Sequence, residues 1–470
     1  MRISILIVIL VVLLAQCSKK GISGNSNIKT AVATVSSLDQ QTVKGWGCCP
    51  VWIDNIDIST QPLSQHAAYQ MGATIIRLSE TAGTRDEFGN ISQNGADRLC
   101  RAIQVTSNYG FHYILSNWSP PACMKTIAVN GSVSGDTLVY LQTSKEQAFC
   151  DFVVKLMDYI SITKGLPLPV AYSLQNEPTC QGQWAGCIYD SAQYRRVTKR
   201  LRATLDAAGY AAILMLGPED GGYNNGNGWN WSVGLLGGND FPSLNDTAFN
   251  RAIAAFASHS YDWNPNTSIV NYDAWINGCE LWGKERWQTE YCYIEDTMSP
   301  HAVGTVRRFI SDMAYLKNNY WFTWTVNDGY GHDVPDALCF GDGVNYLNRK
   351  PAYYVLKRLF SSIPVGSKVR RMLTTDDELV TQNAGRMDMV AFASDTNMVA
   401  VIVNPTSSVK KTDINGLVGT KALVYQVSST LNNTDMTLIS SPFISAGSIS
   451  ILSLPVNSVT IVVAFGISRK

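Results

Sequence analysis

The sequence predicts an α/β protein in which a (β/α)8 TIM barrel is followed by an appended antiparallel β-sandwich. Two observations support this prediction. Strand-like and helix-like patterns alternate up to about residue 363 of the 470-residue chain, which is typical of a parallel sheet covered by helices. Beyond Val365, short strand-like segments follow one another between turns rich in Gly, Asn and Ser, as in an antiparallel sandwich.

Eight strand-like segments indicate the barrel, because eight successive strand–helix units close a parallel sheet on itself. Such a barrel carries its functional residues at the C-terminal ends of its strands, which form its mouth. The predicted barrel strands are Thr42–Cys49, Gly72–Ser79, Phe111–Trp118, Val170–Glu177, Ala212–Gly217, Ala255–Tyr261, Arg286–Tyr291 and Tyr320–Val326.

Helix-like patterns separate most of these strands, and in three of them apolar residues recur three or four positions apart. The second has Asp190 or Ser191 as its N-cap and Gly209 as its stop signal. The third begins at Ser299-Pro300, a capping residue followed by proline at the first helical position. The three apolar stripes run through residues 149–160, 194–208 and 306–313.

The C-terminal part contains six strand-like segments, and the alternating residues 31–38 are expected to join them as an N-terminal strand. We therefore expect this strand of the side domain over residues 31–41, the barrel over 42–363 and the sandwich over 364–470. The predicted sandwich strands are Val369–Leu373, Met389–Phe392, Met398–Val403, Ala422–Val427, Ser448–Leu454 and Ser458–Ala464.

The N-terminus has the layout of an export signal. Arg2 precedes an apolar run from Ile5 to Ala15, which is too short to span a membrane because a spanning helix needs about 20 apolar residues. Residues 14–17, Leu-Ala-Gln-Cys, resemble a bacterial lipoprotein processing box with Cys17 as the lipidated residue. An ordinary signal peptide is the alternative, and residues 18–30 would form a flexible tether.

These features predict an exported protein. The expected location is the outer membrane or cell surface of a Gram-negative-type bacterium, through a lipid anchor, and otherwise the periplasm or the medium. Lys+Arg and Asp+Glu both number 37, so the formal net charge is zero, which argues against a nucleic-acid partner. Few charges and many aromatic residues suit a neutral ligand that stacks, such as a sugar. The protein is expected to be a monomer.

The chain contains 11 cysteines, and export permits disulfides. Cys180 and Cys187 bracket a short loop after the fourth predicted strand and are the first choice for a bridge, while the other pairings stay open. No Cys-x-x-Cys spacing occurs and the histidines are scattered, so we predict neither a metal site nor a cofactor.

Two glutamates stand at the ends of predicted strands. Glu177 ends the fourth strand within Asn-Glu-Pro, and Glu290 ends the seventh. The fourth and seventh strands of an eight-stranded barrel lie on facing sides of its mouth, so these carboxylates can converge. Hydrolysis of a glycosidic bond with retention of configuration needs two carboxyl groups about 5–5.5 Å apart. The pair therefore predicts a retaining glycoside hydrolase.

Four further segments make the chain resemble glycoside hydrolase family 30 over nearly its whole mature length. Residues 118–125 have the sequence Trp-Ser-Pro-Pro-Ala-Cys-Met-Lys, which matches a motif of that family except at Cys123, where the family has Trp. Gly217–Glu219 after the fifth strand and His259–Tyr261 after the sixth also fit. So does the helix-like segment Lys350–Ile363, which leads into a C-terminal β-domain.

The resemblance implies roles for the residues at the mouth. Glu177 would be the general acid/base and Glu290 the nucleophile. Asn176 would hydrogen-bond the sugar 2-hydroxyl, and Tyr261 would orient Glu290.

The resemblance also implies residues that surround the sugar at the cleavage point. Trp118 and Trp324 would form its walls, and Trp46 and Arg77 would line the floor. Two alternatives remain open at the sequence level: Arg77 is an ion-pair partner of the glutamates or a structural clamp, and His259 is a substrate contact or a structural residue.

The sequence favours the xylanase branch of that family, because residues 175–178 and 187–189 resemble that branch. Glucuronate-dependent members bind their acidic side group with an arginine just after the eighth strand, whereas here no arginine follows Trp324 until Arg349. We therefore expect an endo-β-1,4-xylanase without a strict glucuronate requirement. The alternatives are a β-1,6-glucanase or galactanase, an exo-acting β-xylosidase, and a non-catalytic surface glycan-binding protein.

Overall fold

The structure of the protein is a computed structural model. Four predictions fall outside the residues that it describes: the N-terminal signal with Cys17, the tether after it except for Thr30, the pairing partner Cys180 of Cys187, and the helix start at Ser299-Pro300. The described residues are 30–50, 62–80, 84–86, 88–127, 138–179, 186–222, 246–261, 273–292, 301–327, 336–374, 388–428 and 436–466.

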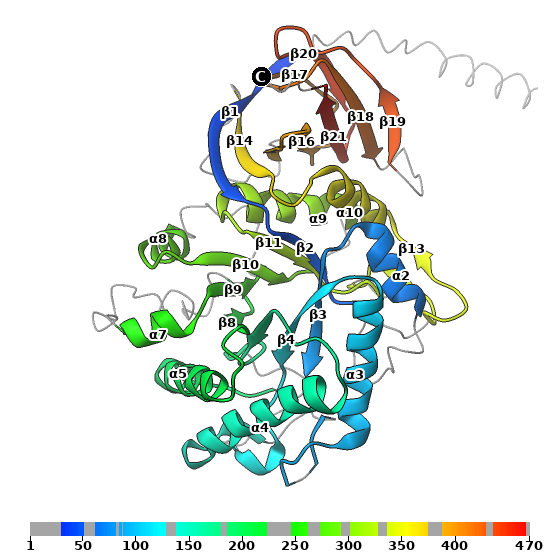
Figure 1. Ribbon diagram of the computed structural model, residues 1–470. Helices are drawn as coiled ribbons and strands as arrows, with labels where there is room; N and C mark the ends of the chain where they lie inside the picture. The colour runs from blue at the N-terminus through cyan, green and yellow to red at the C-terminus, as the bar shows by residue number, and fades with distance from the viewer. Residues whose placement is uncertain are drawn as a thin grey trace, which may run out of the picture.

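Eight parallel strands form a closed barrel, in the order β10-β11-β2-β3-β4-β7-β8-β9, which confirms the predicted fold class (Figure 1). Every strand overlaps the segment predicted for it. In chain order β7 is the fourth barrel strand and β10 the seventh. The barrel strands are β2 (Gly45–Cys48), β3 (Ile75–Glu80), β4 (His112–Asn117), β7 (Ala171–Ser173), β8 (Leu214–Asp220), β9 (Ala255–His259), β10 (Glu285–Glu290) and β11 (Tyr320–Thr323).

The inside of the barrel is filled by apolar side chains from alternate positions of its strands. Strand β2 contributes no side chain to it, because Gly45 and Gly47 face inward and a Cβ at either would collide with the rings of Tyr320 and Phe322. The glycines therefore let the two rings of β11 fill the space beside β2. The remaining filling comes from Ile75, Ile114, Ala171, Leu216, Ala255, Ala257 and Trp287.

The same alternation corrects one prediction. Trp46 lies between the two inward-facing glycines, so its side chain points out of the barrel. It stacks on Phe360 with ring centroids 5.2 Å apart, contacts Phe392 of the sandwich and donates its indole N–H to the carbonyl of Ile363. The prediction that Trp46 lines the floor of the mouth is wrong; it packs in the core between barrel and sandwich.

Helices cover the barrel in the described part of the chain. Asp190 is the N-cap of α5, since its carboxylate accepts from the backbone N–H of Gln193, which decides between the two predicted caps. Helices α4 and α9 each continue into a π-helical turn, Tyr159–Thr163 and Ser311–Tyr315. The helices are α2 (Pro62–Met71), α3 (Gln93–Asn108), α4 (Glu146–Asp158), α5 (Ser191–Ala207), α7 (Thr247–Ala252), α8 (Asp273–Leu281), α9 (His301–Ile310) and α10 (Pro351–Ser362).

The second domain is a nine-stranded sheet with the order β19-β18-β21-β16-β15-β14-β1-β17-β20. All its pairs are antiparallel except β1 with β17, and its inner face buries an apolar core of its own. The six predicted strands and the N-terminal strand are all present. The strands are β1 (Thr30–Thr42), β14 (Lys368–Thr374), β15 (Asp388–Ala393), β16 (Asn397–Asn404), β17 (Lys410–Asn415), β18 (Lys421–Ser428), β19 (Thr437–Ser440), β20 (Ile449–Leu454) and β21 (Ser458–Phe465).

Strand β1 runs from the sandwich into the barrel, where β2 follows it, and α9 and α10 lie between the two domains (Figure 1). A buried ion pair joins them, with Nε of Arg307 on α9 2.5 Å from Oδ2 of Asp388 on β15. The guanidinium of Arg358 on α10 lies 4.0 Å from the ring centroid of Tyr425 on β18. The two domains therefore share a packed interface.

Two short pairs of strands lie at the mouth of the barrel. Strand β5 (Lys125–Ile127) pairs with β6 (Leu138–Leu141) after β4, and β12 (Cys339–Phe340) pairs with β13 (Asn348–Arg349) after β11. Along the described segments, none of the helices has the length and apolar character needed to cross a membrane.

Candidate active site

Glu177 and Glu290 approach each other from the ends of two strands. Glu290 is the last residue of β10, and Glu177 follows β7 with a backbone φ of +48°. A non-glycine residue in this region is strained, and such strain is retained where surrounding contacts fix the backbone. Here the N–H of Glu177 donates to the carbonyl of Glu219, and that of Asn176 to the carbonyl of Asn117. These contacts aim the Glu177 carboxyl into the mouth.

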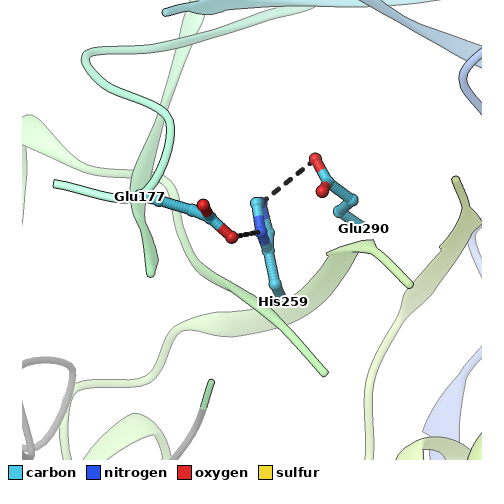
Figure 2. Close-up of side chains that lie close together, drawn as sticks. All are labelled: Glu177, His259 and Glu290. Carbon is cyan, nitrogen blue, oxygen red and sulfur yellow. Dashed lines mark hydrogen bonds and ion pairs between the residues drawn. The ribbon is translucent and has the colours of Figure 1, made fainter. Parts of the chain in front are cut away.

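The imidazole of His259, at the end of β9, stands between the two carboxyl groups, as Figure 2 shows. Its Nδ1 shares a hydrogen bond of 3.0 Å with Oε1 of Glu177, and its Nε2 lies 3.7 Å from Oε2 of Glu290. Burial opposes protonation of the ring, but Glu290 and Glu177 outweigh it and raise the pKa of His259. Its position is thus that of a group that links the two carboxyls rather than one that only packs.

Arg77 of β3 is the cation of the site. Its Nη1 donates to Oε2 of Glu290 at 2.6 Å, its Nη2 to Oδ1 of Asn176 at 2.7 Å, and its Nε to Oε1 of Glu219 at 3.1 Å. Its guanidinium also lies 4.6 Å from the ring centroid of Trp118. Arg77 is therefore both an ion-pair partner of the carboxylates and the clamp that holds Asn176, so the two alternatives were not exclusive.

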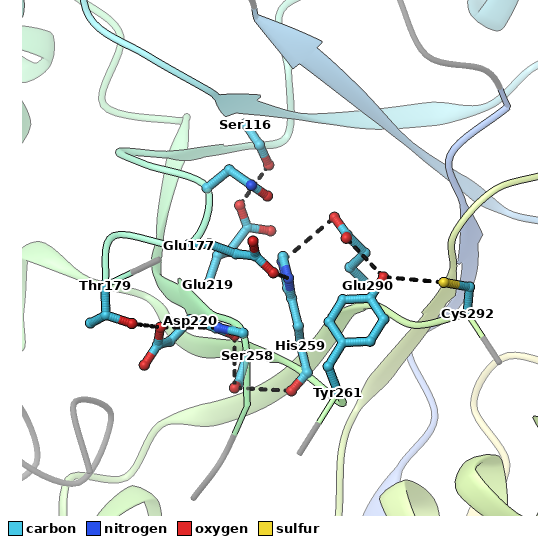
Figure 3. Close-up of polar contacts among 12 residues, drawn as sticks. Ser116, Glu177, Thr179, Glu219, Asp220, Ser258, His259, Tyr261, Glu290 and Cys292 are labelled. Carbon is cyan, nitrogen blue, oxygen red and sulfur yellow. Dashed lines mark hydrogen bonds and ion pairs between the residues drawn. The ribbon is translucent and has the colours of Figure 1, made fainter. Parts of the chain in front are cut away.

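Glu219 forms a second ion pair with the guanidinium of Arg77. It is fully buried at the end of β8, with φ +54°, and its Oε2 accepts from the hydroxyl of Ser116 at 2.7 Å (Figure 3). Burial opposes its ionisation, but Arg77, followed by His259, outweighs burial and keeps the pKa of this carboxyl below its ordinary value. Because Glu219 shares the guanidinium, Arg77 does not neutralise Glu290 alone.

Both oxygens of Glu290 are held. Tyr261 donates its hydroxyl to Oε1 at 2.9 Å, and Arg77 donates to Oε2. Burial raises the pKa of Glu290, against the opposing effects of His259 and Arg77. The sulfur of Cys292 lies 3.6 Å from the Tyr261 hydroxyl (Figure 3). A carboxylate fixed at both oxygens has one defined orientation.

Two indole rings border this cluster. Trp118 follows β4 and Trp324 follows β11, and their ring centroids lie 6.1 Å apart. The structure thus brings together eight of the residues predicted for the site, whereas Trp46 lies elsewhere. These eight are Arg77, Trp118, Asn176, Glu177, His259, Tyr261, Glu290 and Trp324.

Several residues near the glutamates were not predicted as site residues. Ser116 lies on the same face of β4 as Ile114, which points into the barrel, so strand alternation could have identified it. Cys49 follows β2, and its sulfur lies 3.8 Å from Nη1 of Arg77. Cys292 follows Glu290 by two positions. No sequence signal separates these thiols from the other buried cysteines.

Glu177, His259 and Glu290 each offer one ligand atom within 4.8 Å of the others, so a cation could in principle bridge them. However, Arg77 already places a positive charge 2.6 Å from Oε2 of Glu290. The guanidinium therefore already supplies the positive charge that a cation would bring to Glu290.

Asp220, next to Glu219, is a buried carboxyl that forms no hydrogen bond with Glu177 or Glu290. It is 1% exposed, and its Oδ1 accepts from the hydroxyl of Thr179 and from the backbone N–H of Gly221. Among the described residues, no group donates to its Oδ2. Burial raises the pKa of Asp220 from 3.8 to about 6. Its ionised form therefore destabilises the fold.

Asp220→Asn is expected to become more stable relative to the wild type as the pH rises. The unfolded carboxyl loses its proton near pH 3.8 and the folded one near pH 6, so the wild type loses stability as the pH rises through this window. The difference between the pKa values of the folded and unfolded states corresponds to about 3 kcal/mol in the free energy of unfolding. Urea unfolding of both proteins at about pH 3.5 and about pH 7 measures the difference.

The substitution itself also changes stability by an amount that does not depend on pH. Comparing the two pH values cancels this amount. Asp395→Asn is the matched control, because it removes a carboxyl from an exposed position. A stability difference between Asp220→Asn and the wild type that does not change with pH would contradict a buried, reluctantly ionised Asp220.

Structural comparison shows the fold of glycoside hydrolase family 30. A family 30 subfamily 8 xylanase from Clostridium acetobutylicum aligns with 92% of this chain and 99% of its own, at 20% identity and a TM-score of 0.71. A conserved exported protein from Bacteroides fragilis aligns over 92% and 100%, at 16% identity and a TM-score of 0.72. An endo-β-1,6-glucanase aligns over 93% and 95%, at 16% identity and a TM-score of 0.61. Neither a family model nor a curated relative matches the sequence.

Proposed function

We propose that this protein is a retaining glycoside hydrolase that cleaves β-linked polysaccharide by double displacement. One observation carries the proposal: Glu177 and Glu290 face each other from the fourth and seventh barrel strands, and Tyr261 and Arg77 fix both oxygens of Glu290. Proteins of the same fold include xylanases and an endo-β-1,6-glucanase. A non-catalytic glycan-binding protein would not need both carboxyl groups.

In the first step, a carboxylate oxygen of Glu290 attacks the anomeric carbon of the sugar. Glu177 gives its proton to the glycosidic oxygen as that bond breaks, and the aglycone leaves as an alcohol. The sugar is then bound covalently to Glu290. In the second step, Glu177 takes a proton from water, the water oxygen attacks the anomeric carbon, and the bond to Glu290 breaks. The configuration is retained because it is inverted twice.

Asn176 and His259 support these steps. Arg77 donates to Oδ1 of Asn176, which fixes the amide so that its N–H groups point away from the guanidinium, and in this mechanism they donate to the sugar 2-hydroxyl. His259 contacts Glu177, and its Nδ1 donates to the carboxylate that Glu177 becomes once it has given up its proton in the first step.

For the substrate, we propose β-1,4-xylan, cleaved within the chain (endo action) and without a strict requirement for glucuronate. The structurally similar proteins include family 30 xylanases, and the sequence has no arginine between Trp324 and Arg349 to bind an acidic side group. The endo-β-1,6-glucanase of the same fold makes β-1,6-glucan the second candidate. A β-1,6-galactan and an exo-acting cleavage of β-xylosides remain the further alternatives.

A product profile against glucuronoxylan, unsubstituted xylan, β-1,6-glucan and β-1,6-galactan tests both levels of this proposal. Xylo-oligosaccharides of mixed length from both xylans are the expected products. Release of xylose alone would make the enzyme exo-acting, and gluco-oligosaccharides would favour β-1,6-glucan. A mechanism-based 2-fluoro sugar of the hydrolysed class should modify Glu290, and peptide mass spectrometry identifies the labelled residue. A label on another residue would refute the role of Glu290 as nucleophile.

We also propose that the protein is exported and anchored through a lipid on Cys17. The support is the charged Arg2, the apolar run Ile5–Ala15 and the Leu-Ala-Gln-Cys sequence at residues 14–17. Mass spectrometry of the mature N-terminus from a bacterial host tests this: a diacylglyceryl Cys17 is expected. An unmodified N-terminus after cleavage would indicate an ordinary signal peptide.

A further inference from the structure

A small turn rises at the mouth of the barrel after β3. We call it the rim turn and define it as residues 84–86 and 88–92. Its two ends pair, since the N–H of Ser92 donates to the carbonyl of Thr84 and Arg85 forms a bridge with Ile91. At its base, the guanidinium of Arg85 contacts the buried carboxylate of Glu80, the last residue of β3, at 2.6 Å. The turn is thus tied to the end of a barrel strand.

The tip of the rim turn is fixed by its own hydrogen bonds. Oδ1 of Asp86 accepts from the backbone N–H groups of Phe88 and Asn90 at 2.9 and 2.8 Å, and Oδ2 accepts from the amide of the Asn90 side chain. Gly89 has φ +79°, a conformation that favours glycine. A side chain on such a tip is held in place before any ligand arrives, which lowers the entropy lost on binding.

The rim turn rests on the loop that follows Trp118. A Cβ added to Gly89 would lie 2.9 Å from Cε of Met124 and 3.1 Å from the sulfur of Cys123. The two loops are therefore in direct contact. Cys123 itself is exposed.

Phe88 at the tip is 74% exposed. Single exposed apolar side chains are common and need no explanation by themselves. Here Phe88 stands on a fixed turn at the mouth of the barrel, and its neighbour Gly89 contacts the loop that follows Trp118. In addition, Cys123 is the one position where residues 118–125 lack the tryptophan of the motif that they resemble. The chain thus has an aromatic side chain on the neighbouring turn and none at position 123.

We propose that Phe88 forms an outlying sugar-binding subsite, in which its ring packs against the apolar C–H face of a pyranose unit remote from the bond that is cleaved. Aromatic rings bury a large apolar area at low cost in side-chain freedom, and a neutral ligand suits this chain of zero net charge. The ligand class is a β-linked polysaccharide chain long enough to extend from the glutamate pair over the rim turn. This inference rests on the proposed function of the same site.

The test compares a long and a short substrate. Phe88→Ala should lower kcat/KM for the polysaccharide hydrolysed by the wild type about tenfold relative to kcat/KM for the aryl glycoside of its shortest hydrolysed unit. The reason is that only the long chain reaches the rim turn. Phe88→Tyr should keep the wild-type ratio, and Cys123→Trp in the Phe88→Ala background should restore part of it.

Phe443→Ala is the matched control, because Phe443 is 73% exposed on the β-sandwich and should leave both kinetic constants unchanged. An unchanged ratio in Phe88→Ala, or equal losses on both substrates, would overturn the subsite. Affinity electrophoresis in gels that contain xylan or β-1,6-glucan needs no turnover. Weaker retention of Phe88→Ala than of Phe443→Ala would therefore support the subsite even if the wild type proved inactive, and equal retention would refute it.

Discussion

Replacement of Glu290 by Gln is expected to lower kcat for glycoside hydrolysis by about 10⁴- to 10⁶-fold, the range seen when a nucleophile is removed. The amide has nearly the shape of the carboxylate but no charge with which to attack the anomeric carbon. It also turns an N–H group towards either Tyr261 or Arg77, both of which donate to Glu290. Steady-state kinetics with an aryl glycoside measures the loss.

The control for this variant is Glu280→Gln. The side chain of Glu280 is 48% exposed and pairs with Lys317 at the surface, so the same chemical change should leave kcat near the wild-type value. In Glu290→Ala, added azide should restore turnover and give a glycosyl azide of inverted configuration, because it attacks from the face that the carboxylate vacates. An azide product of retained configuration would assign Glu290 a different role.

Replacement of Glu177 by Gln is expected to have an effect that depends on the leaving group. Proton transfer from a positioned acid contributes about 10²- to 10⁴-fold, so cleavage of a polysaccharide, whose leaving alcohol needs the proton, should fall by about this factor. An aryl glycoside with a nitrophenolate leaving group needs no proton in the first step. In that case the second step becomes limiting, because water has lost its base.

A burst of phenolate followed by slow turnover is therefore the expected trace for Glu177→Gln with the activated substrate. Intact-protein mass spectrometry should detect the glycosyl-enzyme that accumulates. Azide needs no general base, so it should speed the second step and give a glycosyl azide of retained configuration. If polysaccharide and activated aryl glycoside lost the same factor and no intermediate accumulated, Glu177 would not be the acid/base.

The fold could be predicted because most barrel strands carry apolar residues that are buried and helix-like segments lie between them. The strands that sequence reasoning missed lack this signal. Strand β17 is Lys-Lys-Thr-Asp-Ile-Asn, in which only Thr412 and Ile414 are buried, and β19 is a four-residue edge strand with three exposed residues. They are strands because β1, β18 and β20 offer them partners, which is tertiary information.

The site was predictable where a residue type and a strand end coincide, as for Glu177 and Glu290. Trp46 shows where this reasoning fails. The strand position was right, but the two neighbouring glycines decide which way the ring points, and their meaning depends on Tyr320 and Phe322 of another strand. The shared ion pair of Arg77 with Glu219 likewise joins β3 to β8 and has no sequence signature. Contacts of this kind appear only once the barrel is closed.

Strand β1 has a consequence for the order of folding. It pairs with β14 on one side and with β17 on the other, so its partners lie more than 300 residues further along the chain. The first of the described strands therefore finds its partners only when the C-terminal part of the chain is present. Until then, both of its edges are bare, and the barrel that follows it directly is tethered to an incomplete sheet. Cutting the chain between barrel and sandwich would leave β1 permanently in this state, so the two domains behave as one folding unit rather than as an enzyme with a removable appendage.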